Sequence, residues 1–135
     1  MDEFSQARND LTAGDYKGAI HNACKSFESL LKEVLQRESG NAGELIRTLR
    51  QTDFYDDVPE DMRRAFGDSV LMALPFLRNR LGGHGQGPDV VEVPREYAEL
   101  AVNVAAAFIV FAVQKRPTSV AKEGEPQVTE DEIPF

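Results

Sequence analysis

The sequence predicts an all-α fold, a bundle of about four to five helices over residues 1–116 followed by a disordered acidic tail over residues 117–135. Three observations predict it. Apolar residues recur at spacings of three and four along residues 1–116. No stretch of useful length alternates apolar with polar residues, as a half-buried strand would. Residues 117–135 lack apolar periodicity and are rich in acids. The 135 residues are one domain's worth of chain and can bury a core.

Two helices are expected at the start of the chain. The first runs from Asp2 to Thr12 and the second from Asp15, whose side chain can cap it, to about Glu38. The sequence Ser39-Gly40-Asn41 supplies the glycine that commonly follows a helix end. The predicted buried face of the second helix consists of Ala19, Ala23, Phe27, Leu30, Leu31, Val34 and Leu35.

A third, short helix is expected over residues 42–51, and a fourth over residues 60–80 after the loop that ends at Pro59. Pro75 lies inside the fourth helix and has no N–H to donate. We therefore expect a bend or interruption near Leu71, whose carbonyl loses its usual donor. The predicted apolar face of this helix is Phe66, Val70, Leu71, Leu74 and Leu77.

A last helix is expected from Pro94 to about Arg116, after a glycine-rich loop over residues 82–93. Its segment LAVNVAAAFIVFAV, residues 100–113, is apolar nearly all round. The segment is shorter than the ~20 residues that cross a bilayer, so we expect a central core helix or a helix–helix interface. Asn103 is its only polar residue and a candidate for a buried hydrogen bond, for example across a dimer axis.

Composition narrows the possible functions. The net charge is −8; residues 117–135 hold one Lys and five acids, so half of that charge lies in the tail. Nonspecific binding to duplex DNA is not expected, because it needs a basic surface. Cys24 is the only cysteine, which fits a reduced, cytoplasmic setting. We expect no cofactor, no metal site and no membrane partner, and the polar residues 1–10 do not resemble a signal peptide.

The most basic cluster of the chain precedes its most glycine-rich stretch, in FLRNRLGGHGQG at residues 76–87. Arg78 can contact a phosphodiester with two N–H groups and stabilise developing negative charge. His84 titrates near neutral pH and can act as general base or acid. Asn79 can orient the imidazole or the substrate. These three residue types suit metal-independent phosphodiester chemistry, with Arg78, Asn79 and His84 as the candidate catalytic residues.

Four neighbours are candidates for binding phosphate. Arg80 can steer the backbone of a nucleic acid, and glycines without side chains let a phosphate approach backbone N–H groups. The glycines concerned are Gly82, Gly83 and Gly85. A purely structural interpretation fits the same spacing: cations favour a helix C-terminus, and a glycine commonly ends a helix.

The segment Arg78-Asn79-Arg80-Leu81-Gly82-Gly83-His84-Gly85 resembles the RNxxGxxHG-type signature of the abortive infection C-terminal family. LTAGDYKGAIHNACKSFESLLKEVL resembles its opening helical pair, and YAELAVNVAAAFIVFAV its final helix. That family in turn resembles the HEPN domains, all-α dimers whose Arg-x4-6-His motif cuts RNA without metal. The resemblance implies a HEPN-like helical domain over residues 1–116, a homodimer, and phage defence by a ribonuclease that uses Arg78 and His84. HEPN-like domains also serve as non-catalytic modules.

The sequence closes with TEDEIPF, which resembles the C-terminal tip of bacterial single-stranded DNA-binding protein (SSB). That tip recruits replication and repair enzymes. An aromatic side chain can fill an apolar pocket while a terminal carboxylate pairs with a basic rim, and neighbouring acids add long-range attraction. The expected partner-binding residues are Glu130, Asp131, Glu132, Ile133, Pro134 and Phe135. An acidic, solubilising tail is the simpler alternative.

Two functions therefore remain open. One is an anti-phage or toxin-type ribonuclease acting on RNA through Arg78 and His84. The other is a non-catalytic adaptor or decoy whose tail binds a replication or repair enzyme. Two further features are not expected to be functional sites. The acids between Asp53 and Asp61 could hold a cation but fit a solvated loop better. His21 is expected to be a partly exposed surface residue.

Overall fold

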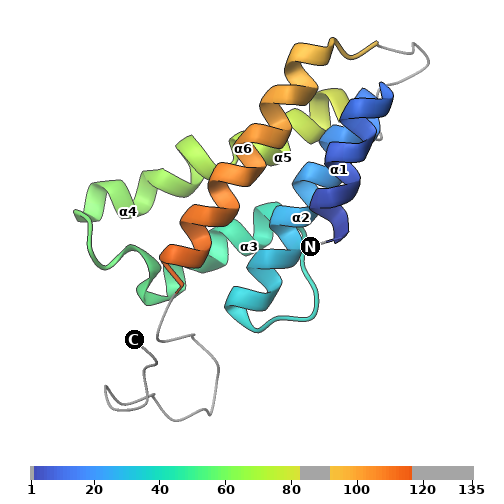
Figure 1. Cartoon of the computed structure of the whole chain (residues 1–135). Helices are drawn as coiled ribbons and strands as arrows, with labels where there is room; N and C mark the ends of the chain where they lie inside the picture. The colour runs from blue at the N-terminus through green and yellow to red at the C-terminus, as the bar shows by residue number, and fades with distance from the viewer. Residues whose placement is uncertain (1, 83–91, 117–135) are drawn as a thin grey trace.

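A computed structural model describes residues 2–82 and 92–116, and all its elements are helical (Figure 1). The all-α prediction is confirmed; with residues 60–82 counted as one interrupted rod, the described part has five helical segments. The α-helices are α1 (Asp2–Ala13), α2 (Tyr16–Leu35), α3 (Ala42–Thr48), α4 (Glu60–Phe66), α5 (Ala73–Leu77) and α6 (Arg95–Gln114). The 3-10 turns η1 (Leu49–Gln51) and η2 (Asp53–Tyr55) follow α3, and the π-helical turns η3 (Gly67–Leu71) and η4 (Arg78–Gly82) flank α5.

Helix α2 is the centre of the fold, with α1, α3, α6 and η4 all packed against it. Its buried face contains every residue predicted for it, together with Ile20, Cys24 and Ser26. Asp15 caps its start as predicted, accepting a hydrogen bond from the Gly18 N–H at 3.0 Å. The packing of α1, α3, α6 and η4 therefore depends on this one helix.

Helix α2 ends three residues earlier than the sequence predicts. Gln36 adopts the left-handed conformation, with φ 56°, and the Arg37 N–H donates to the Lys32 carbonyl at 2.8 Å. This is the bond pattern of a Schellman-type helix end, which glycine usually makes. The buried face of α2 finishes at Leu35, so no further packing favours continuing the helix. Gly40 also has a positive φ, but it serves the turn into α3.

The rod formed by α4, η3, α5 and η4 is interrupted where Pro75 predicts it. The Met72 N–H donates five residues back to the Gly67 carbonyl at 2.8 Å, so the chain widens into a π turn that ends at Leu71. One prediction fails here: Val70 is 38% exposed, although Leu71 and Leu74 are buried. The extra residue in the widened turn shifts the helical phase and rotates Val70 away from the core.

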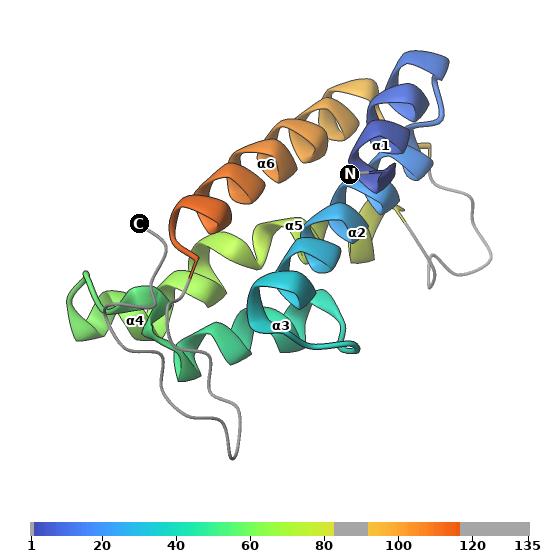
Figure 2. The same cartoon turned by 60° about the horizontal axis from the view of Figure 1, so that its bottom comes forward.

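Helix α6 lies along α2 and α1, with one side buried and the other open to solvent (Figure 2). Of the two expectations for this segment, the central core helix is wrong, because α2 holds that place. The alternative, a helix–helix interface, stays a prediction. Asn103 is exposed, so its predicted burial does not occur within one chain. By length and composition alone, α6 is apolar enough to cross a membrane, and 33% of its most apolar window is buried inside the fold.

The π turn η4 packs closely on α2 at Gly82. A Cβ atom built on Gly82 would lie 2.7 Å from Cγ2 and 2.9 Å from Cβ of Ile20, closer than packed carbon atoms allow. Ile20 is fully buried and branched at this position, so it cannot swing away. The absence of a side chain at Gly82 is therefore a packing requirement.

We expect Gly82→Ala to lower the free energy of unfolding by about 1–3 kcal/mol, because it overpacks the contact with Ile20. Gly43→Ala is the matched control: its new Cβ would meet no atom closer than 3.4 Å, and alanine favours a helix. Urea unfolding followed by circular dichroism measures both. Equal stability of the two variants would contradict the close packing at Gly82.

Burial should also make the fold sensitive to alkaline pH. Burial raises the pKa of the Cys24 thiol from 9.0 to about 11 and that of the Tyr55 hydroxyl from 10.0 to about 12. Above pH 9 the unfolded chain loses the Cys24 proton while the folded chain keeps it, so the free energy of unfolding falls as pH rises from 9 towards 11. Cys24→Ala should flatten this fall in urea titrations at successive pH values. An unchanged slope would show that Cys24 makes no contribution.

Candidate functional site

The basic cluster Arg78-Asn79-Arg80 occupies the π turn η4, which lies against the N-terminal half of α2. Arg78 is half-buried, whereas Asn79 and Arg80 are exposed. The widened turn separates the two guanidinium groups, with Arg78 turned towards α2 and Arg80 towards α5. The structure therefore gives the two arginines different surroundings.

Arg78 lies beside the buried thiol of Cys24. Burial is the main cause of the raised pKa of Cys24, while the charge of Arg78 and its hydrogen bond to the thiol partly lower that pKa and the charge of Glu28 raises it. Glu28 also approaches Lys32, with 3.6 Å between the carboxylate and the ammonium nitrogen. The side chain of Arg78 thus lies against α2, beside Cys24.

Arg80 stacks on an aromatic ring instead. Its guanidinium carbon lies 5.4 Å from the centre of the Phe76 ring, and Phe76 is 57% exposed. Such a cation–π contact at an exposed site is worth about 0.5–1 kcal/mol, so it positions Arg80 without burying its charge. The sequence signal for it was the spacing of four residues between Phe76 and Arg80, which places both on one side of a helical turn.

Gly82 closes the described part of the cluster and is buried against α2. A Cβ built on it would lie 3.4 Å from the backbone nitrogen of His21, which is half-buried. Gly82, the last described residue before the gap, thus lies beside the face of α2 that carries His21. The predicted site residues Gly83, His84 and Gly85 lie outside the described residues.

Sequence reasoning missed the partners that fix this cluster. Ile20 and Cys24 both belong to the apolar face of α2. No pattern in the sequence indicates that Gly82 and Arg78, more than 50 residues later, contact them. The predicted partner-binding residues at positions 130–135 also lie outside the described residues.

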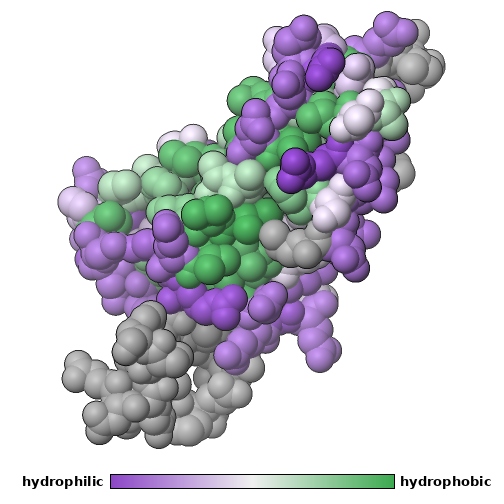
Figure 3. All heavy atoms as spheres, viewed as in Figure 1, coloured by the Kyte–Doolittle hydropathy of each residue, from purple (hydrophilic) through white to green (hydrophobic). Residues whose placement is uncertain are grey.

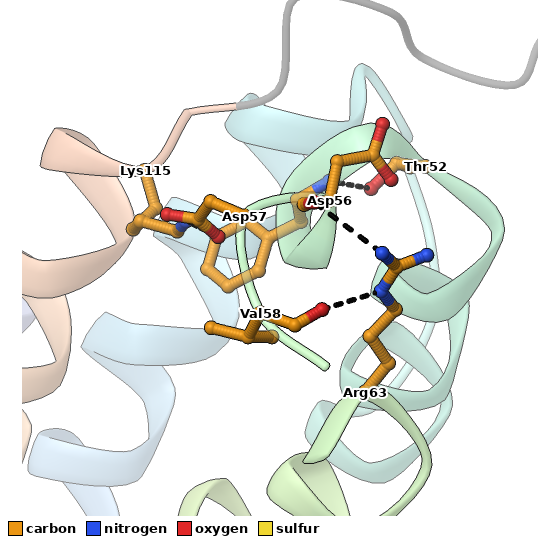
Figure 4. Close-up of polar contacts among 7 residues, drawn as sticks. Thr52, Asp56, Asp57, Val58, Arg63 and Lys115 are labelled. Atoms are coloured by element: carbon orange, nitrogen blue, oxygen red, sulfur yellow. Dashed lines mark hydrogen bonds and ion pairs between the residues drawn. The ribbon is translucent and has the colours of Figure 1, made fainter. Parts of the chain in front are cut away.

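The acidic segment between Asp53 and Asp61 is organised by cations from the chain itself (Figure 4). Arg63 donates to the Val58 carbonyl at 2.8 Å and to the Asp56 carbonyl at 3.4 Å, and Lys115 pairs with Asp57. The hydrogen bond from Lys115 holds the pKa of Asp57 below its usual value. Within residues 2–82 and 92–116, no three His, Cys, Asp or Glu side chains gather as metal ligands would.

Beside this segment lies a small apolar cavity of about 120 Å³ between η2, α4 and the end of α6. Lys115 and Asp57 are the charged residues that line it. The other lining residues are apolar or aromatic: Tyr55, Val58, Met62, Phe66 and Phe111. The Phe66 and Phe111 rings are 5.5 Å apart. This cavity lies away from η4, because α4 is at the start of the rod and η4 is at its end. The cavity also meets the C-terminal end of α6.

A match to a known protein family covers the whole helical part of the chain. Residues 1–116 match the model of the Abi_C family, described as a HEPN-like domain. The sequence shows no significant match to a curated protein or to a solved structure. The match spans both the central helix and the Arg78-Asn79 cluster that packs on it. The chain accordingly belongs to the Abi_C family of HEPN-like domains and is an abortive-infection, toxin-type HEPN protein.

Proposed function

We propose that this chain is a metal-independent endoribonuclease of phage defence that acts through Arg78 and His84. The observation that carries the proposal is the seating of Arg78: a half-buried guanidinium held against α2, six positions before the imidazole in the family's motif. Fold alone does not imply activity, so the proposal depends on this constellation of residues.

The proposed reaction is a transesterification within the RNA. His84 takes the proton of a 2′-hydroxyl as its oxygen attacks the adjacent phosphorus, and the bond from phosphorus to the 5′-oxygen breaks. The imidazolium then returns a proton to the leaving 5′-oxygen. The products are a 2′,3′-cyclic phosphate and a 5′-hydroxyl.

The remaining residues of the cluster bind and orient the substrate. Arg78 stabilises the negative charge that grows on the phosphoryl oxygens, and Asn79 orients the imidazole or the substrate. Arg80, fixed on Phe76, binds the neighbouring backbone phosphate. Backbone N–H groups of the glycine segment meet the phosphate oxygens.

End-labelled RNA incubated with the protein in EDTA tests this reaction. We expect cleavage with cyclic-phosphate ends, reduced about 10²–10⁴-fold by His84→Ala and about 10²–10³-fold by Arg78→Ala, since each removes a group that acts in the transition state. Arg78→Lys should restore only part of the rate, because lysine keeps the charge but not the paired N–H donors.

Arg8→Ala is the control, because Arg8 is an exposed basic residue on α1. It should leave cleavage unchanged, and circular dichroism should show that all variants remain folded. Cleavage that survives in both His84→Ala and Arg78→Ala would overturn the assignment of the site. So would cleavage that EDTA abolishes.

We propose a second function for the tail, favoured by the likeness of TEDEIPF to the SSB tip. The acids Glu130 to Glu132 would draw this segment to a basic surface, and Ile133 and Phe135 would fill an apolar pocket of a replication or repair enzyme. Pro134 limits the freedom of the segment and so lowers the entropy lost on binding. The tail would then place the helical domain at its target, or act as a decoy where the domain does not cut RNA.

Displacement of a labelled SSB-tip peptide from a bacterial enzyme that binds that peptide measures this function. The full chain should displace it, and Phe135→Ala should weaken displacement at least tenfold through loss of the aromatic anchor. Val128→Ala, an apolar truncation outside the motif, should have no effect. Equal displacement by Phe135→Ala would refute the tail function without touching the ribonuclease proposal.

A further inference from the structure

A polar groove of about 380 Å³ lies at the turn between α1 and α2. Its wall contains the exposed carboxylates of Asp15 and Glu92 and the half-buried side chains of Tyr16 and Lys17. Figure 3 shows apolar side chains gathered on the face that α6 presents and hydrophilic ones at its two ends, and the groove lies at the end where α6 begins. A groove of this volume, with a few polar groups and one aromatic residue, suits a small polar ligand.

The groove borders the face of α2 on which the basic cluster rests. Lys17 lies one turn before His21, whose backbone nitrogen is 3.4 Å from a Cβ built on Gly82. Cys24, beside which Arg78 lies, follows Lys17 on the same face at a distance of about 11 Å along the helix axis. One RNA strand with a phosphate at Arg78 can therefore place a base in the groove.

The described residues on the two sides of the gap both lie at the first two turns of α2. Gly82 packs against Ile20, and Glu92 stands in the wall of the groove together with Lys17. The candidate base His84 falls between these two residues in the sequence. The groove is therefore next to the residues that frame the proposed catalytic motif.

The carboxylates of the groove favour one RNA base over the others. A carboxylate accepts hydrogen bonds and donates none, so it matches a ligand edge made of N–H donors. Guanine presents two neighbouring donors on its Watson–Crick edge, N1–H and the 2-amino group, whereas each of the other three bases presents an acceptor beside its donor. One oxygen of Asp15 already accepts from the Gly18 N–H at 3.0 Å, so Glu92 is the carboxylate that can accept from both donors.

The other groups of the groove fit the same ligand. Tyr16 supplies an aromatic ring, on which RNA-binding proteins commonly stack an unpaired base. The ammonium of Lys17 suits the O6 acceptor of guanine. The negative charges of Asp15 and Glu92 repel phosphate, so the groove takes the base while the backbone phosphates lie at the arginines of η4.

We infer that this groove binds a guanine base of the RNA substrate, with Tyr16 stacked on the base and Glu92 accepting from N1–H and the 2-amino group. The inference rests on the proposed ribonuclease for its substrate, although base binding is measurable without cleavage. Glu92 is then a specificity-determining residue, and the chain cuts RNA mainly next to guanosine.

Titration of the full chain with each of the four ribonucleoside monophosphates, followed by amide NMR, tests the groove. GMP should shift the amide signals of Gly14, Lys17 and Val93 and should bind about tenfold more tightly than AMP, CMP or UMP, since a paired hydrogen-bond contact discriminates between bases by at least about this factor. These ligands contain no internucleotide bond, so the result does not depend on catalysis. Equal affinity for GMP and AMP, or shifts confined to residues outside the groove, would overturn the inference.

Three substitutions test the two named contacts. Glu92→Gln should weaken GMP binding about tenfold and leave AMP binding unchanged, because the amide replaces one acceptor oxygen by a donor. Tyr16→Leu keeps an apolar side chain against the core but removes the ring, so it should weaken binding of every nucleotide, whereas Tyr16→Phe should bind GMP normally. Circular dichroism should show that all three variants remain folded. Unchanged GMP affinity in both Glu92→Gln and Tyr16→Leu would refute the assignment.

Glu96→Gln is the matched control for Glu92→Gln. Glu96 is an exposed acid in the first turn of α6 and does not line the groove. Its variant should bind GMP as the parent chain does. A loss of GMP affinity equal to that of Glu92→Gln would show a general charge effect and overturn the role of Glu92.

RNA cleavage separates this inference from the ribonuclease proposal. When both hold, cleavage falls mainly next to guanosine, and Glu92→Gln lowers that preference. GMP binding in the groove without any RNA cleavage would refute the ribonuclease and leave the groove standing. Cleavage without preference for a base, together with equal binding of GMP and AMP, would refute the groove and leave the ribonuclease standing.

An arginine side chain of a partner protein is the competing ligand, because a guanidinium also presents paired donors and stacks on aromatic rings. The positive charge of Lys17 disfavours it. N-acetylarginine amide is the probe, and we expect it to bind more weakly than GMP. Tighter binding of this probe, lost in Glu92→Gln, would assign the groove to a protein partner and overturn the inference.

Discussion

The burial of α2 is the constraint on which the rest of the structure depends. A 20-residue helix with α1, α3, α6 and η4 around it leaves only a narrow strip for polar groups. Small residues let the neighbours approach: Ala19 and Ala23 are fully buried, and Ser26 satisfies its hydroxyl by donating to the Ala23 carbonyl at 2.7 Å. Because close packing tolerates little change in volume, the elements around α2 have few alternative positions.

The candidate site follows from that packing through the two π turns of the rod. Pro75 deprives Leu71 of a hydrogen bond, and the chain responds with a widened turn before α5. A second widened turn after α5 presses Gly82 onto Ile20 and thereby sets Arg78 beside Cys24. The same turn directs Arg80 outwards onto Phe76. The π turn η4 thus places Arg78 against α2 and Arg80 at the surface, although the two residues are only two positions apart in the sequence.

Sequence patterns within one or two helical turns predicted most of the helices, but they predicted few of the contacts between distant segments. The all-α class, the Asp15 cap and the interruption near Leu71 each depend on residues within one or two turns, so the sequence is sufficient for them. The early end of α2 at Gln36 and the outward rotation of Val70 depend on where packing stops and on helical phase, which a turn of unusual width alters. The residue types of the site were visible in the sequence, but the contact of Arg78 with α2 joins segments more than 50 residues apart, and no periodicity encodes it.

Helix α6 has a buried side that the fold needs for stability and an exposed side that it does not. Packing on α2 and α1 requires one apolar side, which Ala98, Ala101, Ala105 and Ile109 provide. The outer side could carry charges at no cost to that packing, as the exposed strip of α2 does with Lys25 and Glu33. Its lack of charge from Leu100 to Gln114 therefore has no explanation within one chain. Exposed Leu100 and Val110 lower solubility unless something covers them.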